Sequence, residues 1–303
     1  MRRDAGAVLI NALVIVLVIS AIAAGLLTRA EGARVRGAEA QVSAQLALYL
    51  DGIEGLLPTL LMEPVEDGAA HLGQSWATQD FTYAIDRGHV TAKLTDLQAG
   101  LNVNWLVTPD DYAIDTFELL FGELGVPLSL VAALADFLAP GGPRQTGAYS
   151  ERNIPIRPNG GPVATLPELR QVNGMTDAIY AKLAPYLSAL PPSARLNLNT
   201  AAPQVLRAAL VPFPGELITE TLARGADDPM SAMSDFRNRL IEILATEDID
   251  DYPVDRLTAG SDWFGARMVA TLEGHDRVRR VVLLRVVEAD NTMQVVYRWT
   301  EYD

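Results

Sequence analysis

The feature that most constrains this chain is an unbroken apolar stretch near its amino terminus. Residues 7–27 depart from apolar side chains only at Asn11, Ser20 and Gly25. At about 1.5 Å of rise per residue, a helix of this length covers the roughly 30 Å hydrocarbon core of a bilayer. A short leader, residues 1–6, carries two arginines that favour a cytoplasmic location for this end. The pattern predicts one membrane-spanning helix.

A secretory signal peptide is the alternative interpretation, with a cleavage site near Ala23-Ala24-Gly25. The apolar stretch is longer than the usual core of a signal peptide. It also runs into an amphipathic segment without a helix-breaking residue. We therefore expect the helix to be retained in the mature protein.

The same helix is expected to continue beyond the membrane. Residues 28–57 carry an apolar stripe at helical spacing, formed by Leu46, Leu50, Ile53 and Leu57. Pro58 is the expected stop, because proline cannot donate a backbone hydrogen bond. The prediction is a long rod whose first half lies in lipid and whose second half packs one face against an apolar surface.

Alternation of apolar and polar residues predicts strands in two separate regions. Residues 80–86 and 89–95 alternate, and Asp86-Arg87-Gly88 between them is typical of a hairpin turn. A second region, rich in valine and aromatic residues, begins near Asp262. Strands are expected there at 264–272, 278–287 and 293–299, and residues 273–276 are expected to form the turn between the first two.

Helical periodicity fills the region between the two sets of strands. Helices are expected at 115–124, at 128–138 and from 166 to 244, around a Gly- and Pro-rich loop at 140–162. Within the last region, two segments are similar to helix-hairpin-helix units: 169–183 and 210–222.

These patterns predict an α+β fold in which a large all-α insertion interrupts a domain made of a long helix and an antiparallel sheet. The expected divisions are a leader at 1–6, a membrane segment at 7–28, the helix and first strands at 29–108, the helical insertion at 109–258 and the final strands at 259–303.

Composition excludes several classes of chemistry. The chain has no cysteine, so disulfides, thiolate metal sites and cysteine nucleophiles are impossible. The three histidines, His71, His89 and His275, share no metal-ligand spacing, and no phosphate loop, dinucleotide fingerprint or nucleophile elbow is present. Acidic residues cluster between Glu247 and Asp255, where a solvated connector is the expectation and a Ca²⁺ site the alternative. We therefore do not expect an enzyme. A membrane-anchored hydrolase is a further hypothesis, but the sequence contains no set of catalytic residues that would support it.

The helix-hairpin-helix segments leave a second functional hypothesis, an envelope protein that binds or takes up DNA. Such hairpins can offer backbone N–H groups to phosphate. The net charge of −14 argues against this, since phosphate affinity needs a basic surface. Glu216, Glu220, Asp227 and Asp228 also surround the second hairpin. Plain antiparallel helix packing, with no nucleic acid partner, is the expectation.

The amino terminus resembles a type IV prepilin. In that family a membrane peptidase cuts after a leader glycine and the new amino terminus is usually methylated, which here implies a cut between Gly6 and Ala7. Ordinary pilins carry a glutamate at the fifth position after the cut, where this chain has Asn11. A charged amino terminus buried among apolar helices needs a carboxylate partner, which Asn11 cannot supply to a subunit ahead of it. Such a subunit fits the tip of a fibre.

Further motifs resemble the general secretion pathway protein K family, the minor pseudopilins of type II secretion systems. They are Asp96-Leu97-Gln98, Leu101 to Leu106, Arg152 to Pro155, Pro158 to Gly160, Pro167 to Leu169, Leu190 to Pro192, and Leu196 to Ala201. In the last motif, Asn197, Asn199 and Thr200 are interpreted as structural. We expect them to cap the following helix and to satisfy backbone groups of the loop.

The resemblance implies a type IV pilin-like fold with an inserted helical domain. It implies a protein of the bacterial inner membrane that crosses once and keeps most of its chain in the periplasm. The implied role is to cap the pseudopilus tip and to help initiate assembly for the export of folded proteins. The implied partners are the minor pseudopilins I and J, other pseudopilins, the inner-membrane assembly platform and the prepilin peptidase.

Calcium is associated with this family through an acidic Asp-Trp-x-Asp-x-Asp stretch. Here the corresponding segment is Asp136-Phe137-Leu138-Ala139-Pro140-Gly141, which keeps only its first carboxylate. We therefore carry over no calcium ligand, and no cofactor is expected.

Overall fold

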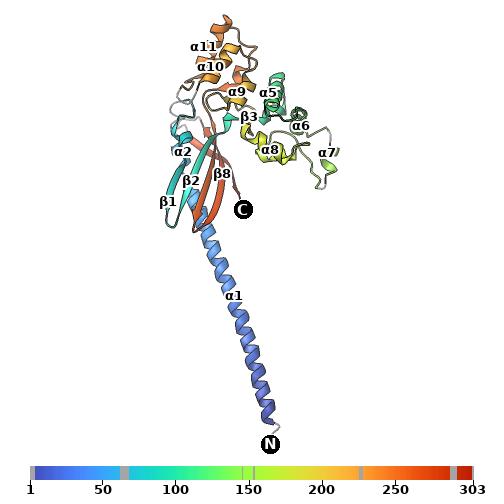
Figure 1. The fold of residues 1–303 in the computed structure, drawn as a ribbon, viewed down its shortest axis with the longest axis vertical. Helices are drawn as coiled ribbons and strands as arrows, with labels where there is room; N and C mark the ends of the chain where they lie inside the picture. The colour runs from blue at the N-terminus through green and yellow to red at the C-terminus, as the bar shows by residue number, and fades with distance from the viewer. Residues whose placement is uncertain are drawn as a thin grey trace.

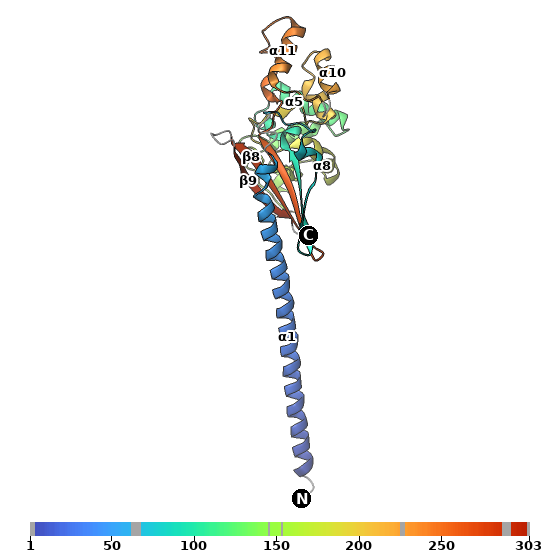
Figure 2. The same cartoon turned by 90° about the vertical axis from the view of Figure 1, so that its left-hand side faces the viewer.

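A single helix, α1 (Asp4–Glu54), forms a rod that projects from the rest of the protein (Figure 1). The computed structural model describes residues 4–61, 68–144, 146–152, 154–224, 228–286 and 292–301. Side chains are described for these residues except 4–11, 282–286, 292 and 301. The view turned by 90° shows the same rod extending away from the other described elements (Figure 2), so its amino-terminal half lies apart from the sheet and the helical block.

An antiparallel sheet of five strands receives the carboxyl-terminal end of the rod. The strand order is β1-β2-β7-β8-β9. The strands are β1 (Phe81–Ile85), β2 (Gly88–Asp96), β7 (Trp263–Leu272), β8 (His275–Val286) and β9 (Thr292–Glu301). Both hairpins predicted from the sequence are present, and β2 pairs with β7 although the inserted block separates them in the chain.

Close packing of the β2–β7 pair requires glycine at one position. Gly88 lies opposite Leu272, and a Cβ atom there would lie 1.9 Å from the carbonyl oxygen of Thr271. The β7–β8 turn has a left-handed backbone at both Glu273 (φ 51°) and Gly274 (φ 82°), the geometry that matches the twist of a two-residue hairpin.

Between β2 and β7 lies a block of helices above the sheet (Figure 1). Its α-helices are α5 (Asp111–Glu123), α6 (Ser129–Leu138), α7 (Gly147–Ser150), α8 (Asp177–Leu183), α9 (Pro203–Leu210), α10 (Gly215–Ala223) and α11 (Met233–Leu244). Its 3₁₀ helices are η1 (Leu97–Ala99), η2 (Val103–Val107), η3 (Leu166–Gln171), η4 (Ala184–Tyr186) and η5 (Val254–Arg256), of which η1 directly follows β2. Two short helices precede the sheet, α2 (Leu57–Leu60) and α4 (Ser75–Thr78).

The buried apolar side chains form two clusters. One joins the end of α1 to the inner face of the sheet, where the rings of Trp76 and Phe264 form a T-shaped contact at a centroid distance of 5.4 Å. The other fills the helical block, around Phe117, Phe121 and Phe236. The fold is therefore a pilin-like helix and sheet with a helical insertion, as predicted.

Two details differ from the sequence-based expectations. The rod ends at Glu54 and not at Pro58, which lies within the separate short helix α2, because Gly55 and Leu56 form a turn between them. Pairs of two-residue parallel strands were not predicted either. They are β3 (Leu101–Asn102) with β4 (Leu187–Ser188), and β5 (Leu196–Asn197) with β6 (Leu257–Thr258).

Candidate functional site

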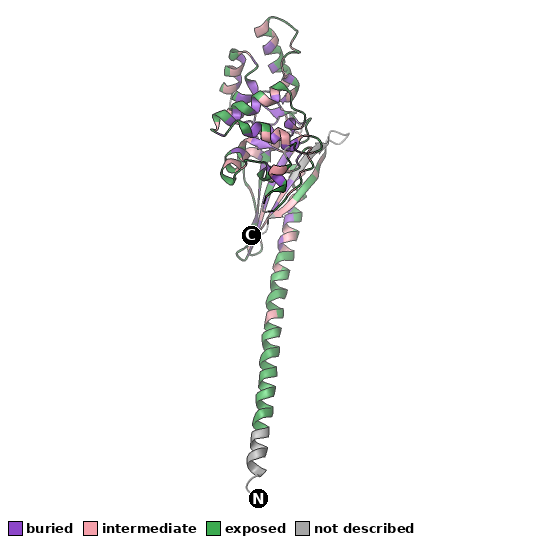
Figure 3. Cartoon of the chain, turned by 90° about the vertical axis from the view of Figure 1, so that its right-hand side faces the viewer, coloured by how far each residue is buried: buried purple, intermediate pink, exposed green. Residues whose placement is uncertain are grey.

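The first candidate surface is the apolar half of α1. The side chains of Leu13, Leu17 and Leu27 are 65%, 67% and 72% exposed, and the large apolar residues between them are also exposed. Within the described residues, α1 contains the one helix long and apolar enough to cross a membrane, by its length and composition. Figure 3 shows the rod exposed from residue 12 to the end of this apolar part. Such a surface is stable only in lipid or against other apolar helices.

The three processing and assembly residues lie on this rod. Gly6, Ala7 and Asn11 are within α1 by their backbone, and their side chains are outside the described part of the structure. Residues 1–3 of the leader lie outside the described residues as well.

The carboxyl-terminal end of the rod is fixed to the sheet by apolar packing. Leu46, Leu50 and Ile53 are buried, which confirms the predicted stripe as far as Ile53, and α1 packs mainly against β7. Leu57 is buried too, but it lies in the separate helix α2. Full burial of one such side chain contributes about 1.5–3 kcal/mol. The sheet is therefore attached to the last turns of α1, whereas the preceding turns of the helix are largely exposed.

An ionic cluster reinforces the attachment. Arg279 of β8 donates to Asp51 and, at 3.2 Å, to Glu54 of α1, and its side chain is only 10% exposed. Arg298 of β9 contacts the other oxygen of Glu54 at 2.6 Å. Arg277 adds a 2.9 Å hydrogen bond to the Ser43 carbonyl. These contacts fix the rotation of α1 about its axis, since each needs one particular face of the helix.

A buried carboxylate lies where the sheet meets the helical block. Asp96, the last residue of β2, accepts hydrogen bonds from Ser261 Oγ at 2.6 Å, Thr200 Oγ1 at 2.5 Å and Asn197 Nδ2 at 2.9 Å. Its other oxygen accepts from the Gln98 N–H at 2.8 Å. Burial raises the pKa of this carboxyl, and the four donors oppose that shift. We call these five residues the Asp96 hub.

Asn197 is the most extensively bonded member of the hub. Its side chain is fully buried, and Nδ2 also lies 2.9 Å from the Ala70 carbonyl oxygen and 2.9 Å from Ser261 Oγ. Its Oδ1 accepts from the N–H of Asn199 at 3.0 Å. The side chain thus connects the helical block to the segments before β1 and before β7.

The expectation that this motif caps the following helix is wrong. The N-cap position of α9 is Ala202, which has no side chain able to accept a hydrogen bond. Asn199 instead bonds the Met230 and Ala259 carbonyls, both at 2.9 Å, and Thr200 bonds Asp96. These side chains satisfy backbone groups of distant loops, because their loop is buried and offers them no solvent.

A second asparagine pair plays the same part at the other side of the block. Asn104 Nδ2 donates to the carbonyls of Val163 and Leu190 at 2.9 and 2.7 Å, and Asn102 Nδ2 donates to the Pro191 carbonyl at 2.8 Å. The sequence motif that contains these asparagines resembles the family, but the motif did not indicate their hydrogen-bond partners.

No role was predicted for the side chains of Asp96 and Ser261. Asp96 ends a strand whose alternate residues point into the core, and this position could have indicated a buried carboxylate.

The described side chains form no evident metal site. No group of three or more His, Asp or Glu side chains converges among them in a way suited to a metal ion. Asp136 Oδ1 accepts the backbone N–H of Arg144 at 3.0 Å, and Asp255 pairs with Arg237 at 2.6 Å. The residues present therefore do not fit the calcium site that the family resemblance implies, and we derive no role for a metal.

Two of the acidic residues around the second hairpin, Glu216 and Glu220, have a structural explanation. Arg239 of α11 contacts both Glu216 and Glu220 of α10 at 2.6 Å, so the two helices are joined by charge as well as by packing.

Known proteins resemble this chain in both sequence and fold. A family model described as type II secretion system (T2SS), protein K, matches residues 99–192. The chain is 30% identical over 229 residues to the type II secretion system protein K of Aeromonas hydrophila, covering 67% of this chain and 69% of that one. It is 29% identical over 266 residues to the protein of the same name from Pseudomonas aeruginosa, covering 80% and 78%.

The fold has a counterpart among solved structures. A chain in the crystal structure of the GspK-GspI-GspJ complex from the type 2 secretion system of enterotoxigenic Escherichia coli superposes with a TM-score of 0.71. The sequence identity is 22%, and the match covers 88% of this chain and 100% of that chain. This likeness concerns the fold.

Proposed function

Because the chain belongs to the type II secretion system protein K family, we propose that this minor pseudopilin caps the pseudopilus tip and helps to initiate its assembly for the export of folded proteins. The observation that carries the proposal is the bare apolar half of α1, whose side chains find no partner in the rest of the described chain. The protein acts by association and not by catalysis.

The rod packs beside the corresponding helices of the minor pseudopilins I and J. Apolar helices in a membrane associate through close packing, and this rod presents apolar side chains on every side. The family relative of similar fold comes from a complex with GspI and GspJ, which supports these two partners. Other pseudopilins and the inner-membrane assembly platform then receive the complex.

The tip position follows from Asn11. A protonated amino terminus within a helix bundle is costly unless a carboxylate pairs with it, and Asn11 offers none to a subunit added ahead. The inserted block, residues 109–258, lies beyond the end of the rod (Figure 1) and adds a steric obstacle to further subunits.

Processing precedes assembly. A prepilin peptidase cuts between Gly6 and Ala7, the new terminus at Ala7 is methylated, and α1 stays in the inner membrane as a single span with the rest of the chain in the periplasm. Mass spectrometry of the mature chain tests this step. An amino terminus at methylated Ala7 is the expected result, and cleavage near residue 25 contradicts the proposal.

A substitution provides the matched control. The Gly6→Val variant blocks close approach of the peptidase to the backbone and should retain residues 1–6, whereas Ser20→Ala should be processed normally. Co-purification of the processed chain with I- and J-type pseudopilins tests assembly. If the protein is found along the whole filament shaft and not only at one end, the result contradicts the proposed position at the tip.

A further inference from the structure

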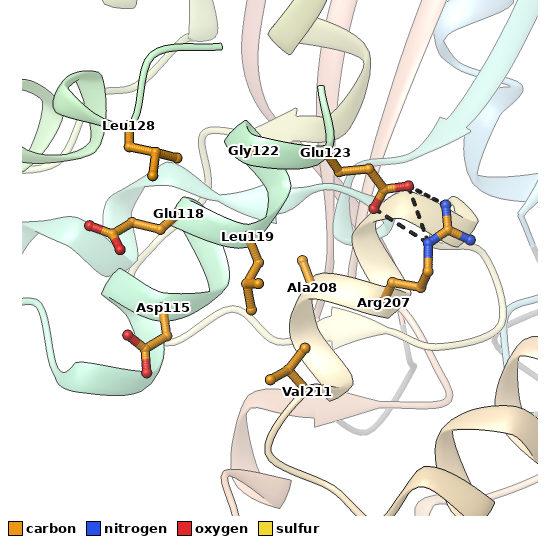
Figure 4. A pocket seen from close by; sticks show the side chains of 9 residues that line it. All are labelled: Asp115, Glu118, Leu119, Gly122, Glu123, Leu128, Arg207, Ala208 and Val211. Carbon is orange, nitrogen blue, oxygen red and sulfur yellow. Dashed lines mark hydrogen bonds and ion pairs between the residues drawn. The ribbon is translucent and has the colours of Figure 1, made fainter. Parts of the chain in front are cut away.

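A groove between α5 and α9 exposes apolar side chains that the packing of the helical block leaves uncovered. One face of α5 is buried, whereas Asp115, Glu118, Leu119 and Gly122 lie exposed at the i, i+3, i+4 and i+7 positions. This spacing places the four on one stripe of the helix. Leu119 points toward α9, whereas Asp115 and Glu118 point away from it (Figure 4). Together with Leu128, α5 and α9 line an open hollow of about 660 Å³.

Three large apolar side chains from separate segments line the groove. Leu119 comes from α5, Leu128 precedes α6 and Val211 follows α9, and they are 41%, 49% and 51% exposed. Ala208 of α9 also lines the groove and lies near Leu119 and Val211 (Figure 4). Apolar surface that gathers in a concave site is typical of a binding groove, unlike single exposed apolar residues, which need no explanation.

The rim of the groove is acidic. Glu123 is held by Arg207, whose Nε lies 3.1 Å from its Oε1 (Figure 4). Asp115 and Glu118 carry no ion pair within the described part of the chain. Two uncompensated carboxylates beside an apolar floor favour a ligand that combines apolar and cationic groups.

Gly122 keeps the groove open. Glycine inside an exposed helix costs about 1 kcal/mol relative to alanine. The fold does not require it here, because a Cβ atom would meet only Leu128 Cδ2, at 3.9 Å, and the backbone is not left-handed. The absent side chain leaves room at the mouth of the hollow, between α5 and Leu128.

We propose that this groove docks a basic amphipathic segment of a partner protein. Its large apolar side chains would contact Leu119, Leu128 and Val211, and an arginine or lysine one helical turn away would pair with Asp115 and Glu118. A second copy of this chain is a poor occupant, since the net charge of −14 and the acidic rim repel it. An anionic membrane surface is excluded by the same charges. The proposal does not depend on the assignment to the pseudopilus tip.

Binding of a synthetic peptide tests the proposal. The full chain in phosphatidylcholine nanodiscs is titrated with a labelled helical peptide that carries leucines on one face and arginines one turn away, and fluorescence anisotropy is recorded against empty nanodiscs. A second peptide, with glutamate replacing each arginine, is the charge control. We expect the arginine peptide to bind at least about tenfold more tightly than the glutamate peptide.

A matched pair of variants tests the location. Gly122→Gln places a side chain in the mouth of the groove and should weaken arginine-peptide binding by about tenfold, whereas Gly122→Ala should leave it within about twofold. Both residues suit a helix, so neither variant should unfold α5. Equal affinities for the two variants would overturn the proposal.

A charge-removal pair tests the recognition. Asp115→Asn combined with Glu118→Gln should weaken binding and flatten its dependence on salt, because the attraction to arginine is lost. Glu247→Gln combined with Asp248→Asn removes two exposed carboxylates elsewhere and should change neither quantity. Equal binding of the arginine and glutamate peptides to the native chain would also overturn the proposal.

Discussion

Asn197 donates a 2.9 Å hydrogen bond from its Nδ2 to the carboxylate of Asp96, although 101 residues separate the two in sequence. Asp96 ends the sheet strand β2, and Asn197 belongs to the helical block. The bond therefore fixes the insertion to the sheet at the point where the chain leaves it. Because the pair is buried, its geometry resists competition from water.

Replacement of Asn197 by alanine should strongly destabilise the protein. The change removes three donor contacts from Nδ2 and leaves the Asp96 carboxylate and the Ala70 carbonyl with fewer partners in a buried site. We expect a loss of about 2–4 kcal/mol in the free energy of unfolding. Urea denaturation of the chain in detergent measures it. Asn238→Ala, at an exposed position of α11, should cost less than about 0.5 kcal/mol, and equal effects of the two changes would contradict a structural role for the hub.

The hub should also make stability depend on pH. Burial raises the pKa of the Asp96 carboxyl above its ordinary value of 3.8, so the folded state binds this proton more tightly than the unfolded state. The contribution of Asp96 to stability is then complete below the unfolded pKa and is lost as pH rises through the folded pKa.

Comparison with Asp96→Asn isolates that contribution, because all other titrating groups are shared. The native chain should gain stability relative to the variant as pH falls from 7 towards 4, and each tenfold change in proton affinity corresponds to about 1.4 kcal/mol. Denaturation at a series of pH values measures the difference. A difference that stays constant from pH 4 to 7 contradicts a raised pKa.

Loss of Arg279 should loosen the rod from the sheet. Arg279→Ala leaves Glu54, whose side chain is 12% exposed, without its more buried cationic partner. We expect a cost of about 2–4 kcal/mol, as for the breaking of a buried ion pair. Arg298, 58% exposed, contacts the same carboxylate from outside, and Arg298→Ala should cost less than about 1 kcal/mol. Thermal unfolding of both variants tests this order, and the reverse order would refute it.

Gly122→Ala should stabilise the helical block. The substitution adds a methyl group to an exposed helix position that has no close neighbour, and it restricts the unfolded chain. We expect a gain of about 0.5–1 kcal/mol. Hydrogen exchange of α5 amides provides a local measurement of it. Gly88→Ala is the opposite case, since its Cβ would collide with the Thr271 carbonyl oxygen, and it should destabilise the sheet.

Local periodicity accounts for the parts of the fold that the sequence alone predicted. The apolar run after Ala7 has the length of a membrane span, the stripe from Leu46 to Leu57 has the spacing of one helix face, and alternation marked β1, β2 and the final meander. Each of these patterns depends only on residues that lie a few positions apart in the sequence, so each can be detected without knowledge of the tertiary structure.

Contacts between distant segments were decided by the tertiary structure. No local pattern indicated that Asn197 would meet Asp96 and Ser261, or that Thr200 would leave the α9 cap empty. Nor did it place Leu119 beside Val211 across a groove. The rod, the strands and the family could therefore be predicted from local patterns and motifs. The partners of buried polar groups and the shape of the surface depended on which elements packed together, because a side chain's hydrogen bonds and burial are properties of its surroundings in space and not of its sequence neighbours.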